Sequence, residues 1–418
     1  MPDADLIRRY RAADATLTVL DEDGSPVAGE DVVVAQRRHR FHFGGTDFDL
    51  VDLANGELEG ERLETVERSA SAFLDLFDFA TLPFYWGRFE PVRGQPDTER
   101  IRTAAQWLVD RGCLVKGHPL CWHTITADWL RDLPVEEVID VQLARIRRDV
   151  ADFAGLIDTW DVINEVVIMP VFDRGENGIT RMAQRLGRVG IVDATFAAAR
   201  ETNRRATLLL NDFDMSADYE HLIEGCLEAG IRIDALGLQS HMHQGYWGVE
   251  KTENVLDRFS RFGLPLHFTE TTLVSGHLMP AEIVDLNDYQ VTDWPSTPDG
   301  EARQAEEAAT HYSTLLSHPA VEAITWWGVP DGGWLNAPSG LIRTDGSPKP
   351  AYERLHALIK GDWWLPPTTL RTDEAGRVPV NGFLGDYDVS WRGRSAAFSL
   401  EEIGSVEVSA RLDTADPR

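Results

Sequence analysis

Short apolar segments alternate with longer amphipathic segments between residues 37 and 361, and this alternation constrains the fold more than any other feature. Helical patterns such as 135–150 and 301–316 separate most of the strand candidates, so the strands are expected to run parallel. No glycine fingerprint follows the first candidate, which argues against a dinucleotide-binding fold. The pattern therefore predicts an α/β protein built on a (β/α)8 TIM barrel, with strand candidates at residues 41–48, 77–85, 114–122, 158–164, 206–212, 234–240, 264–270 and 323–329.

The two ends of the chain carry a different pattern. Residues 15–36 predict two strands around an Asp-Gly-Ser-Pro turn, and the segment after residue 361 contains short alternating runs with almost no helical periodicity. We predict that residues 1–36 and 362–418 together form a small β-sandwich-like accessory domain of about seven strands, packed on a catalytic barrel of residues 37–361. We favour a structural role for this domain, as a cover over part of the barrel. Whether it binds sugar stays open.

Charge and cysteine usage narrow the class of partner. The formal net charge is −29, whereas binding to phosphate groups needs clustered Lys and Arg, so we expect neither a nucleic-acid nor a membrane partner. The three cysteines (Cys113, Cys121 and Cys226) form no CxxC pair and suit a reducing compartment. The N-terminus has no apolar core of a secretion signal, so a cytoplasmic location is expected. The sequence leaves the oligomeric state open.

Polar and aromatic residues gather where the strand candidates end. In a barrel of this type the catalytic groups lie at the carboxyl ends of the strands, so residues at these ends meet at one mouth. The ends of strand candidates three to eight carry, in order, His118, Trp122 and His123; Asn164 and Glu165; Asn211 and Asp212; Gln239 and His241; Glu270; and Trp326, Trp327, Asp331 and Trp334.

Two of these residues are carboxylic acids on strands four and seven, which face each other across a barrel mouth. Glu165 and Glu270 are the catalytic candidates, because glycoside hydrolysis uses one carboxyl group to protonate the leaving oxygen and a second to attack the anomeric carbon or to activate water. Tryptophan, present 13 times, supplies surfaces on which sugar rings stack. The substrate predicted from this set is a carbohydrate or glycoside.

A metal site is the alternative reading of the histidines. His118, His123, His241, His243 and His267 are numerous enough to consider zinc. His118 and His123, five residues apart along a strand, are expected on opposite faces, and the His241/His243 pair has no recurring partner motif. These spacings argue against a catalytic metal.

The barrel region resembles glycoside hydrolase family 10, whose members are retaining endo-β-1,4-xylanases on a (β/α)8 barrel. The resemblance extends over nearly the whole barrel and rests on motifs in the same order and spacing. They are residues 90–97 (EPVRGQPD), 115–123 (VKGHPLCWH), 159–165 (TWDVINE), 208–212 (LLLND), 233–241 (IDALGLQSH), 267–270 (HFTE), 326–331 (WWGVPD) and 347–355 (SPKPAYERL).

The resemblance implies a role for each matching residue. Glu165 is similar to the acid/base of the family and Glu270 to its nucleophile, in a two-step reaction through a covalent glycosyl-enzyme that needs no cofactor. The remaining candidates are similar to substrate-binding or orienting residues of the family: His118 and Trp122 at the inner sugar site, Asn164 beside the sugar 2-hydroxyl, Gln239 near the acid/base, His241 at the nucleophile, and Trp327, with Trp334 nearby, as a wall.

Several positions depart from the family pattern. The family's Glu-Asn-x-x-Lys-Trp motif reads 81-TLPFYW-86, so Thr81, Leu82 and Tyr85 replace its three polar sugar contacts, and Tyr85 becomes a substrate-binding candidate. Ile125 stands at a Gln position, and Thr272 stands where an Asp would support the contact between histidine and nucleophile. A site that has lost its hydrogen-bonding groups loses the preference they gave, so the glycone subsite is predicted to be divergent.

Three functions compete on this basis. The first is a retaining β-glycoside hydrolase that cleaves a β-linked glycan, an oligosaccharide or a small glycoside by double displacement. The second is a conventional endo-β-1,4-xylanase. The third is a non-catalytic carbohydrate-binding protein on a hydrolase barrel, which the retention of both carboxylates disfavours. Glycone, aglycone, linkage and endo or exo action stay open.

Overall fold

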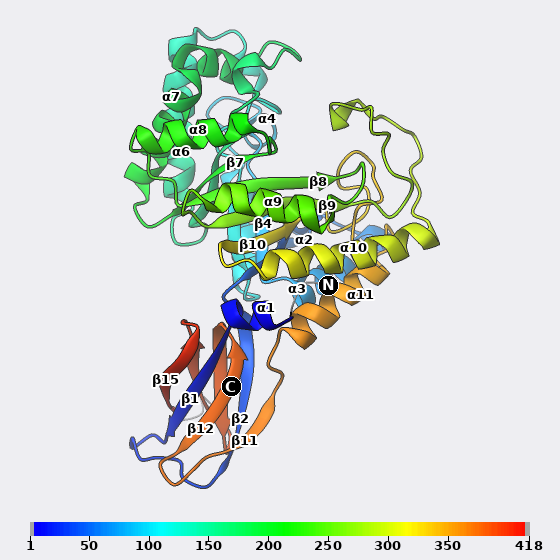
Figure 1. Ribbon diagram of the computed structural model, residues 1–418. Coiled ribbons are helices and arrows are strands. Elements are labelled where there is room, and N and C mark those ends of the chain that lie inside the picture. The colour runs from blue at the N-terminus through cyan, green and yellow to red at the C-terminus, as the bar shows by residue number, and fades with distance from the viewer. Residues whose placement is uncertain (1–3, 414–418) are drawn as a thin grey trace.

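The computed structural model describes residues 4–413 of the 418-residue chain. Eight strands, all parallel, close into a barrel in chain order, and the last strand pairs with the first (Figure 1). The predicted (β/α)8 fold is confirmed. The barrel strands are β3 (His42–Gly45), β4 (Phe79–Pro83), β5 (Leu114–His118), β6 (Thr159–Asn164), β7 (Thr207–Asp212), β8 (Ala235–Met242), β9 (Leu266–Leu273) and β10 (Val321–Trp326).

Helices surround the barrel, because each bears one apolar face that packs against the strands. In α6 (Val135–Asp152), for example, Val138, Ile146 and Val150 are buried. Helix α10 (Pro298–Leu316) begins at Thr297, whose hydroxyl accepts a hydrogen bond from the backbone of Gly300. The other helices are α2 (Asp49–Ala54), α3 (Gly60–Leu76), α4 (Trp86–Phe89), α5 (Thr98–Val109), α7 (Gly178–Thr202), α8 (Ala217–Glu228), α9 (Gly248–Ser260) and α11 (Pro350–Ala357), with short turns η1 (Asp128–Leu130), η2 (Met169–Val171), η3 (Leu286–Asp288) and η4 (Leu358–Asp362).

The barrel interior is packed to the point where one glycine is required. A Cβ atom on Gly117 would lie 2.1 Å from the indole of Trp160, whose side chain is fully buried. Helices cover the outside of the barrel and side chains fill its inside. The strands are therefore apolar in sequence, with polar residues at their ends. All eight residues of β9 are buried.

Both ends of the chain build the accessory β structure. One sheet has the order β12-β1-β15 and the other β11-β2-β13-β14, with a shared core that includes Leu17, Val34 and Tyr387. Seven strands thus form two sheets, as the sequence predicts. They are β1 (Ala12–Leu20), β2 (Asp31–His39), β11 (Thr368–Arg371), β12 (Arg377–Phe383), β13 (Gly385–Trp391), β14 (Arg394–Leu400) and β15 (Gly404–Arg411).

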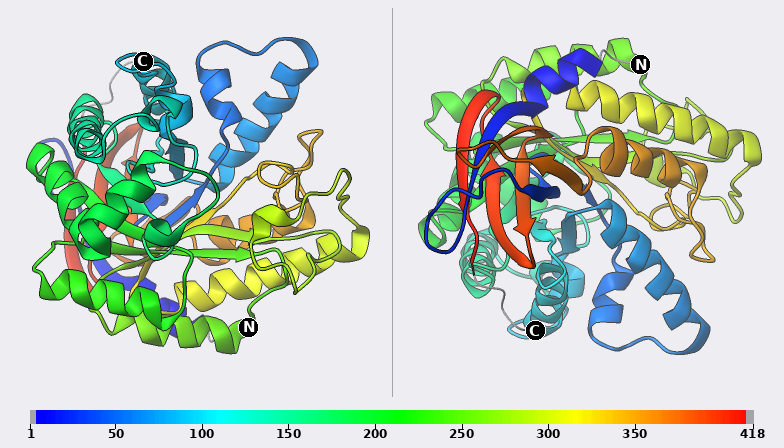
Figure 2. Two further views of the ribbon diagram at one scale, coloured as in Figure 1. Left: turned by 90° about the horizontal axis from the view of Figure 1, so that it is seen from above. Right: turned by 90° about the horizontal axis from the view of Figure 1, so that it is seen from below.

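The accessory sheets lie below the barrel in Figure 1 and in front of it when the molecule is seen from below (Figure 2, right). Helix α1 (Ala4–Arg11), which the sequence pattern did not indicate, leads into β1. At its end Arg11 donates hydrogen bonds to the backbone oxygens of Leu316, His318 and Val321, which lie beside the start of β10. This side chain therefore ties the accessory domain to the floor of the barrel.

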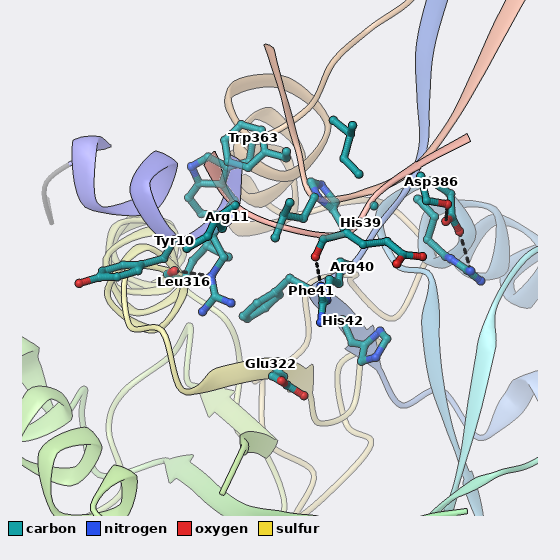
Figure 3. A pocket seen from close by; sticks show the side chains of 18 of the residues that line it. Tyr10, Arg11, His39, Arg40, Phe41, His42, Leu316, Glu322, Trp363 and Asp386 are labelled. Carbon is teal, nitrogen blue, oxygen red and sulfur yellow. Dashed lines mark hydrogen bonds and ion pairs between the residues drawn. The ribbon is translucent and has the colours of Figure 1, made fainter. Parts of the chain in front are cut away.

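A cavity of about 860 Å³ lies at this junction (Figure 3). It is lined by residues at the amino ends of barrel strands, such as His42 and Glu322, and by accessory residues. Its charged groups are largely paired with protein atoms: Arg38 lies 2.6 Å from Asp386, and Arg40 donates to the backbone oxygen of Glu401. The cavity is at the end of the barrel opposite the strand ends that carry the catalytic candidates. Within residues 4–413 no helix is long and apolar enough to span a membrane.

Candidate active site

The mouth of the barrel is organised around the end of β6. Glu165 follows the last strand residue, Asn164, and has a left-handed backbone with φ of 59°. Its backbone N–H bonds the carbonyl oxygen of Asn211 on the next strand at 2.8 Å. A non-glycine residue pays a conformational cost for this geometry, so surrounding contacts must hold it. The turn ends the strand and directs the Glu165 side chain into the site.

Three side chains donate hydrogen bonds to the Glu165 carboxyl group. The indole N–H of Trp122 lies 2.8 Å from Oε2, while Asn164 Nδ2 and Gln239 Nε2 lie 3.2 and 3.4 Å from Oε1. Burial, followed by the negative charge of Glu270, raises the pKa of Glu165 to about 8, although the bonds from Trp122 and Gln239 oppose the rise. The group is therefore mostly protonated at neutral pH.

Glu270 lies in β9, almost fully buried, and has the opposite electrostatic balance. Burial acts to raise its pKa, but the hydrogen bond from His241 and the charges of His118 and His241 outweigh burial and bring the pKa below its ordinary value. His241 Nε2 lies 3.2 Å from Oε2. The site thus holds one protonated and one ionised carboxyl group, which is the division of labour that acid-assisted displacement needs.

The amide of Asn211 links the two halves of the site. Its Nδ2 donates to Asn164 Oδ1 at 2.8 Å and to Glu270 Oε1 at 2.9 Å, and its Oδ1 accepts from the Thr269 hydroxyl at 2.6 Å. Sequence analysis noted Asn211 at a strand end without giving it a role. Its position at the end of a strand that lies between those of the two carboxylates is the signal that could have identified it.

A buried ionic cluster supports the floor of the site. Asp161 Oδ2 lies 2.8 Å from Lys116 Nζ and 2.7 Å from His118 Nδ1, and all three side chains are at most 1% exposed. Burial acts to raise the pKa of Asp161, but Lys116 and His118 lower it below its usual value. The contact at Nδ1 fixes the ring of His118. Sequence analysis did not identify Lys116 or Asp161, because their contacts join different strands.

Aromatic rings lie next to this cluster, at the mouth of the barrel. The ring of His118 lies 5.7 Å from that of Tyr85 and 5.1 Å from that of Trp327, and Tyr85 lies 5.6 Å from Trp122. Trp334 lies 4.5 Å from His241. All ten predicted site residues are therefore connected through direct contacts, with Asn211 linking Asn164 to Glu270. Aromatic rings of this kind are surfaces on which sugar rings stack.

Residues 83–358 match the family described as Glycosyl hydrolase family 10. The chain belongs to this family. It is accordingly a glycoside hydrolase, acting on O-glycosyl bonds.

Several relatives of the chain are named as xylanases. Endo-1,4-beta-xylanase B of Thermotoga neapolitana is 24% identical over 292 residues, which cover 66% of this chain and 78% of that protein. Endo-1,4-beta-xylanase A of Xylanibacter ruminicola is 28% identical over 251 residues, covering 53% of this chain and 64% of that protein. Xylanase 10B from Thermotoga petrophila RKU-1, solved in complex with xylobiose, superposes with a TM-score of 0.62 at 22% identity, over 77% of this chain and 95% of that one, a likeness of fold.

The positions that depart from the family 10 pattern lie in and around the site. Thr81 and Leu82 are buried in β4, and the Thr81 hydroxyl has no hydrogen-bond partner among the described residues. Thr272 Oγ1 lies 3.5 Å from His241 Nδ1 and 3.2 Å from His243 Nδ1, so a neutral hydroxyl stands behind the histidine that contacts Glu270. Among residues 4–413, no three His, Cys, Asp or Glu side chains are grouped in a way that could hold a metal ion.

Proposed function

We propose that the protein is a retaining β-glycoside hydrolase in which Glu165 is the acid/base and Glu270 the nucleophile. The single observation that supports this most strongly is the opposite shift of the two pKa values within one buried site. In the first step the Glu270 carboxylate bonds to the anomeric carbon. The glycosidic C–O bond breaks, and the Glu165 proton passes to the leaving oxygen.

The second step uses the same residues in reverse. Once Glu270 is an ester it carries no charge, so the repulsion that helps raise the pKa of Glu165 is lost and the pKa falls. The ionised Glu165 then takes a proton from water, whose oxygen bonds to the anomeric carbon while the bond to Glu270 breaks. Two displacements at one carbon return the original anomeric configuration.

We further propose that the substrate is an oligosaccharide or small glycoside with a divergent glycone subsite. The support is the apolar character of β4 at the mouth, where Thr81, Leu82 and Tyr85 replace polar contacts of the family pattern. The ring of Tyr85 stands beside those of His118 and Trp122, where the family pattern has a polar sugar contact. A conventional endo-xylanase is the second candidate, favoured by the names of the relatives.

Alanine variants of the two carboxylates, assayed on a panel of nitrophenyl glycosides, xylo-oligosaccharides and plant glycosides, test the proposal. Glu270→Ala should lose turnover on every substrate. Glu165→Ala should lose about 10²–10⁴-fold on oligosaccharides and much less on nitrophenyl glycosides, whose leaving group needs no proton. Proton NMR of the first-formed product should show the β anomer. Turnover that persists in both variants, or an inverted product, refutes the mechanism, and substrate binding without any hydrolysis favours a carbohydrate-binding protein.

A further inference from the structure

Two long loops bound the side of the mouth next to Glu165. Residues 165–177 connect β6 to α7, and residues 274–297 connect β9 to α10. The strands between them, β7 and β8, are followed by the short connections 213–216 and 243–247. The long loops therefore stand on either side of a low stretch of the rim.

The two long loops are tied to each other by charge. Arg174 Nη1 and Nη2 lie 2.6 and 2.8 Å from the two carboxylate oxygens of Asp288, and Nη2 lies 3.2 Å from Asp285. A guanidinium that contacts both oxygens of one carboxylate is a directional interaction rather than a diffuse attraction. Figure 1 shows the loop before α10 projecting outward from the barrel. Residues 277–291, fixed to Arg174, are called the strap below.

The strap is ordered by its own contacts. Trp294 packs in a small apolar cluster with Val274 and Met279, and its indole N–H donates to the backbone oxygen of His277 at 2.9 Å. From the short connection after β8, Gln244 Nε2 donates to two backbone oxygens of the strap, at 2.9 and 2.8 Å. The strap is thus anchored over the end of β8 at one place and to the loop after β6 at another.

The positions of the aromatic rings indicate that the strap lies on the leaving-group side. Tyr85, His118 and Trp327 come from the ends of β4, β5 and β10, and they enclose the sugar that Glu270 attacks under the proposed function. The leaving group departs next to the proton of Glu165, at the end of β6. The adjoining rim, at the ends of β7 and β8, is the part over which the strap runs.

The loops on this side of the mouth carry exposed apolar side chains. Val171 and Phe213, on the connections after β6 and β7, are 66% and 44% exposed, and Leu278 and Val284 of the strap are 38% and 99% exposed. Exposed apolar side chains on loops that flank the leaving-group side offer contacts to an apolar group. A polysaccharide chain, by contrast, needs hydrogen-bond partners along its length.

We infer that the Arg174-tied strap bars long polysaccharide chains from the leaving-group side and selects glycosides with a short, apolar, aryl-type aglycone. The inference rests on the proposed function, since it presupposes that a bond is cleaved between Glu165 and Glu270. It adds a specificity determinant in the two loops that follow the strands bearing the carboxylates. The tie is exposed to solvent, so it can open and is weakened by salt.

The experiment compares substrates that share the hydrolysed glycone and differ in leaving group: an aryl glycoside and oligosaccharides of increasing length. For the wild-type enzyme, kcat/KM should be highest for the aryl glycoside and should not rise beyond a single sugar unit in the leaving group. Arg174→Ala should raise kcat/KM for the longer oligosaccharides, relative to the aryl glycoside, about two- to fivefold. High salt should move the wild-type ratio in the same direction.

Arg185→Ala is the matched control, because Arg185 forms an exposed ion pair with Glu136, 3.1 Å away, on helices outside the mouth. It should leave the ratio unchanged. A kcat/KM that climbs with leaving-group length in the wild-type enzyme, or an Arg174→Ala ratio equal to that of Arg185→Ala, overturns the inference. Either result can occur while both carboxylate variants lose activity as proposed above and the product keeps its configuration, so failure of the strap is distinguishable from failure of the proposed function.

Discussion

Replacing Trp122 by Phe should move the alkaline limit of activity upward. The indole N–H donates to Glu165 at 2.8 Å, and this bond favours the ionised carboxylate. Phe keeps an aromatic ring but lacks the N–H donor. The ionised carboxylate therefore loses a stabilising hydrogen bond, and the pKa of Glu165 rises. The proposed first step needs the protonated form, and activity should therefore persist to higher pH.

The expected size follows from the structure. A hydrogen bond to a charged group contributes about 1.5–3 kcal/mol, and 1.36 kcal/mol corresponds to one pH unit, so the limit should move by about one unit or somewhat more. With the pKa of Glu165 at about 8, roughly a tenth of the wild-type enzyme is protonated at pH 9. In Trp122→Phe roughly half should be, which is a fivefold difference relative to each enzyme's own plateau.

The assay is the pH profile of kcat/KM on one substrate, since this profile reports the free enzyme. The loss of part of a stacking surface lowers the plateau but does not move the limit. Trp327→Phe is the control, because Trp327 walls the same pocket through ring contacts with His118. A limit that stays in place for Trp122→Phe, or that moves equally in both variants, refutes the assignment of Glu165 as the acid.

Other perturbations test the scaffold. Lys116→Met should lower the free energy of unfolding by about 3–5 kcal/mol in denaturant titrations, because it strips a buried Asp161 of an ion-pair partner; a loss under about 1 kcal/mol contradicts this. Gly117→Ala should lower the free energy of unfolding by about 1–3 kcal/mol or prevent folding, since the new Cβ would lie 2.1 Å from Trp160. Arg11→Ala removes hydrogen bonds to three carbonyl oxygens of the barrel, so calorimetry should resolve separate unfolding of barrel and accessory domain, and one unchanged transition counts against that tie.

Local patterns in the chain predict the parts of the site that are local. Apolar runs bounded by turn residues identify barrel strands, and the residues at their ends, including Glu165 and Glu270, meet at the mouth because parallel strands share one carboxyl edge. The turn at Glu165 is different. Its positive φ depends on the backbone of Asn211, a residue on another strand, so no pattern around Glu165 indicates it.

Contacts between distant segments escape sequence analysis for a similar reason. Arg174 and Asp288 are 114 positions apart in loops without periodicity, and each residue alone is an ordinary exposed charge. Lys116 and Asp161 lie within two strands whose apolar character is typical of a buried core. In the sequence each is a single charged residue in an apolar run, and nothing indicates that the two form an ion pair. In both cases the barrel must close before the pairing exists.

The pairing of the accessory strands has a consequence for synthesis of the protein. β1 lies between β12 and β15, and β2 lies between β11 and β13, so both early strands are interior strands whose partners begin at Thr368. Each barrel strand after β3, in contrast, pairs with the strand made just before it. On the ribosome the barrel can assemble strand by strand while β1 and β2 wait with both edges unpaired. Unpaired strand edges are prone to aggregation. The accessory domain, rather than the barrel, therefore sets the interval in which the nascent chain is most prone to aggregate.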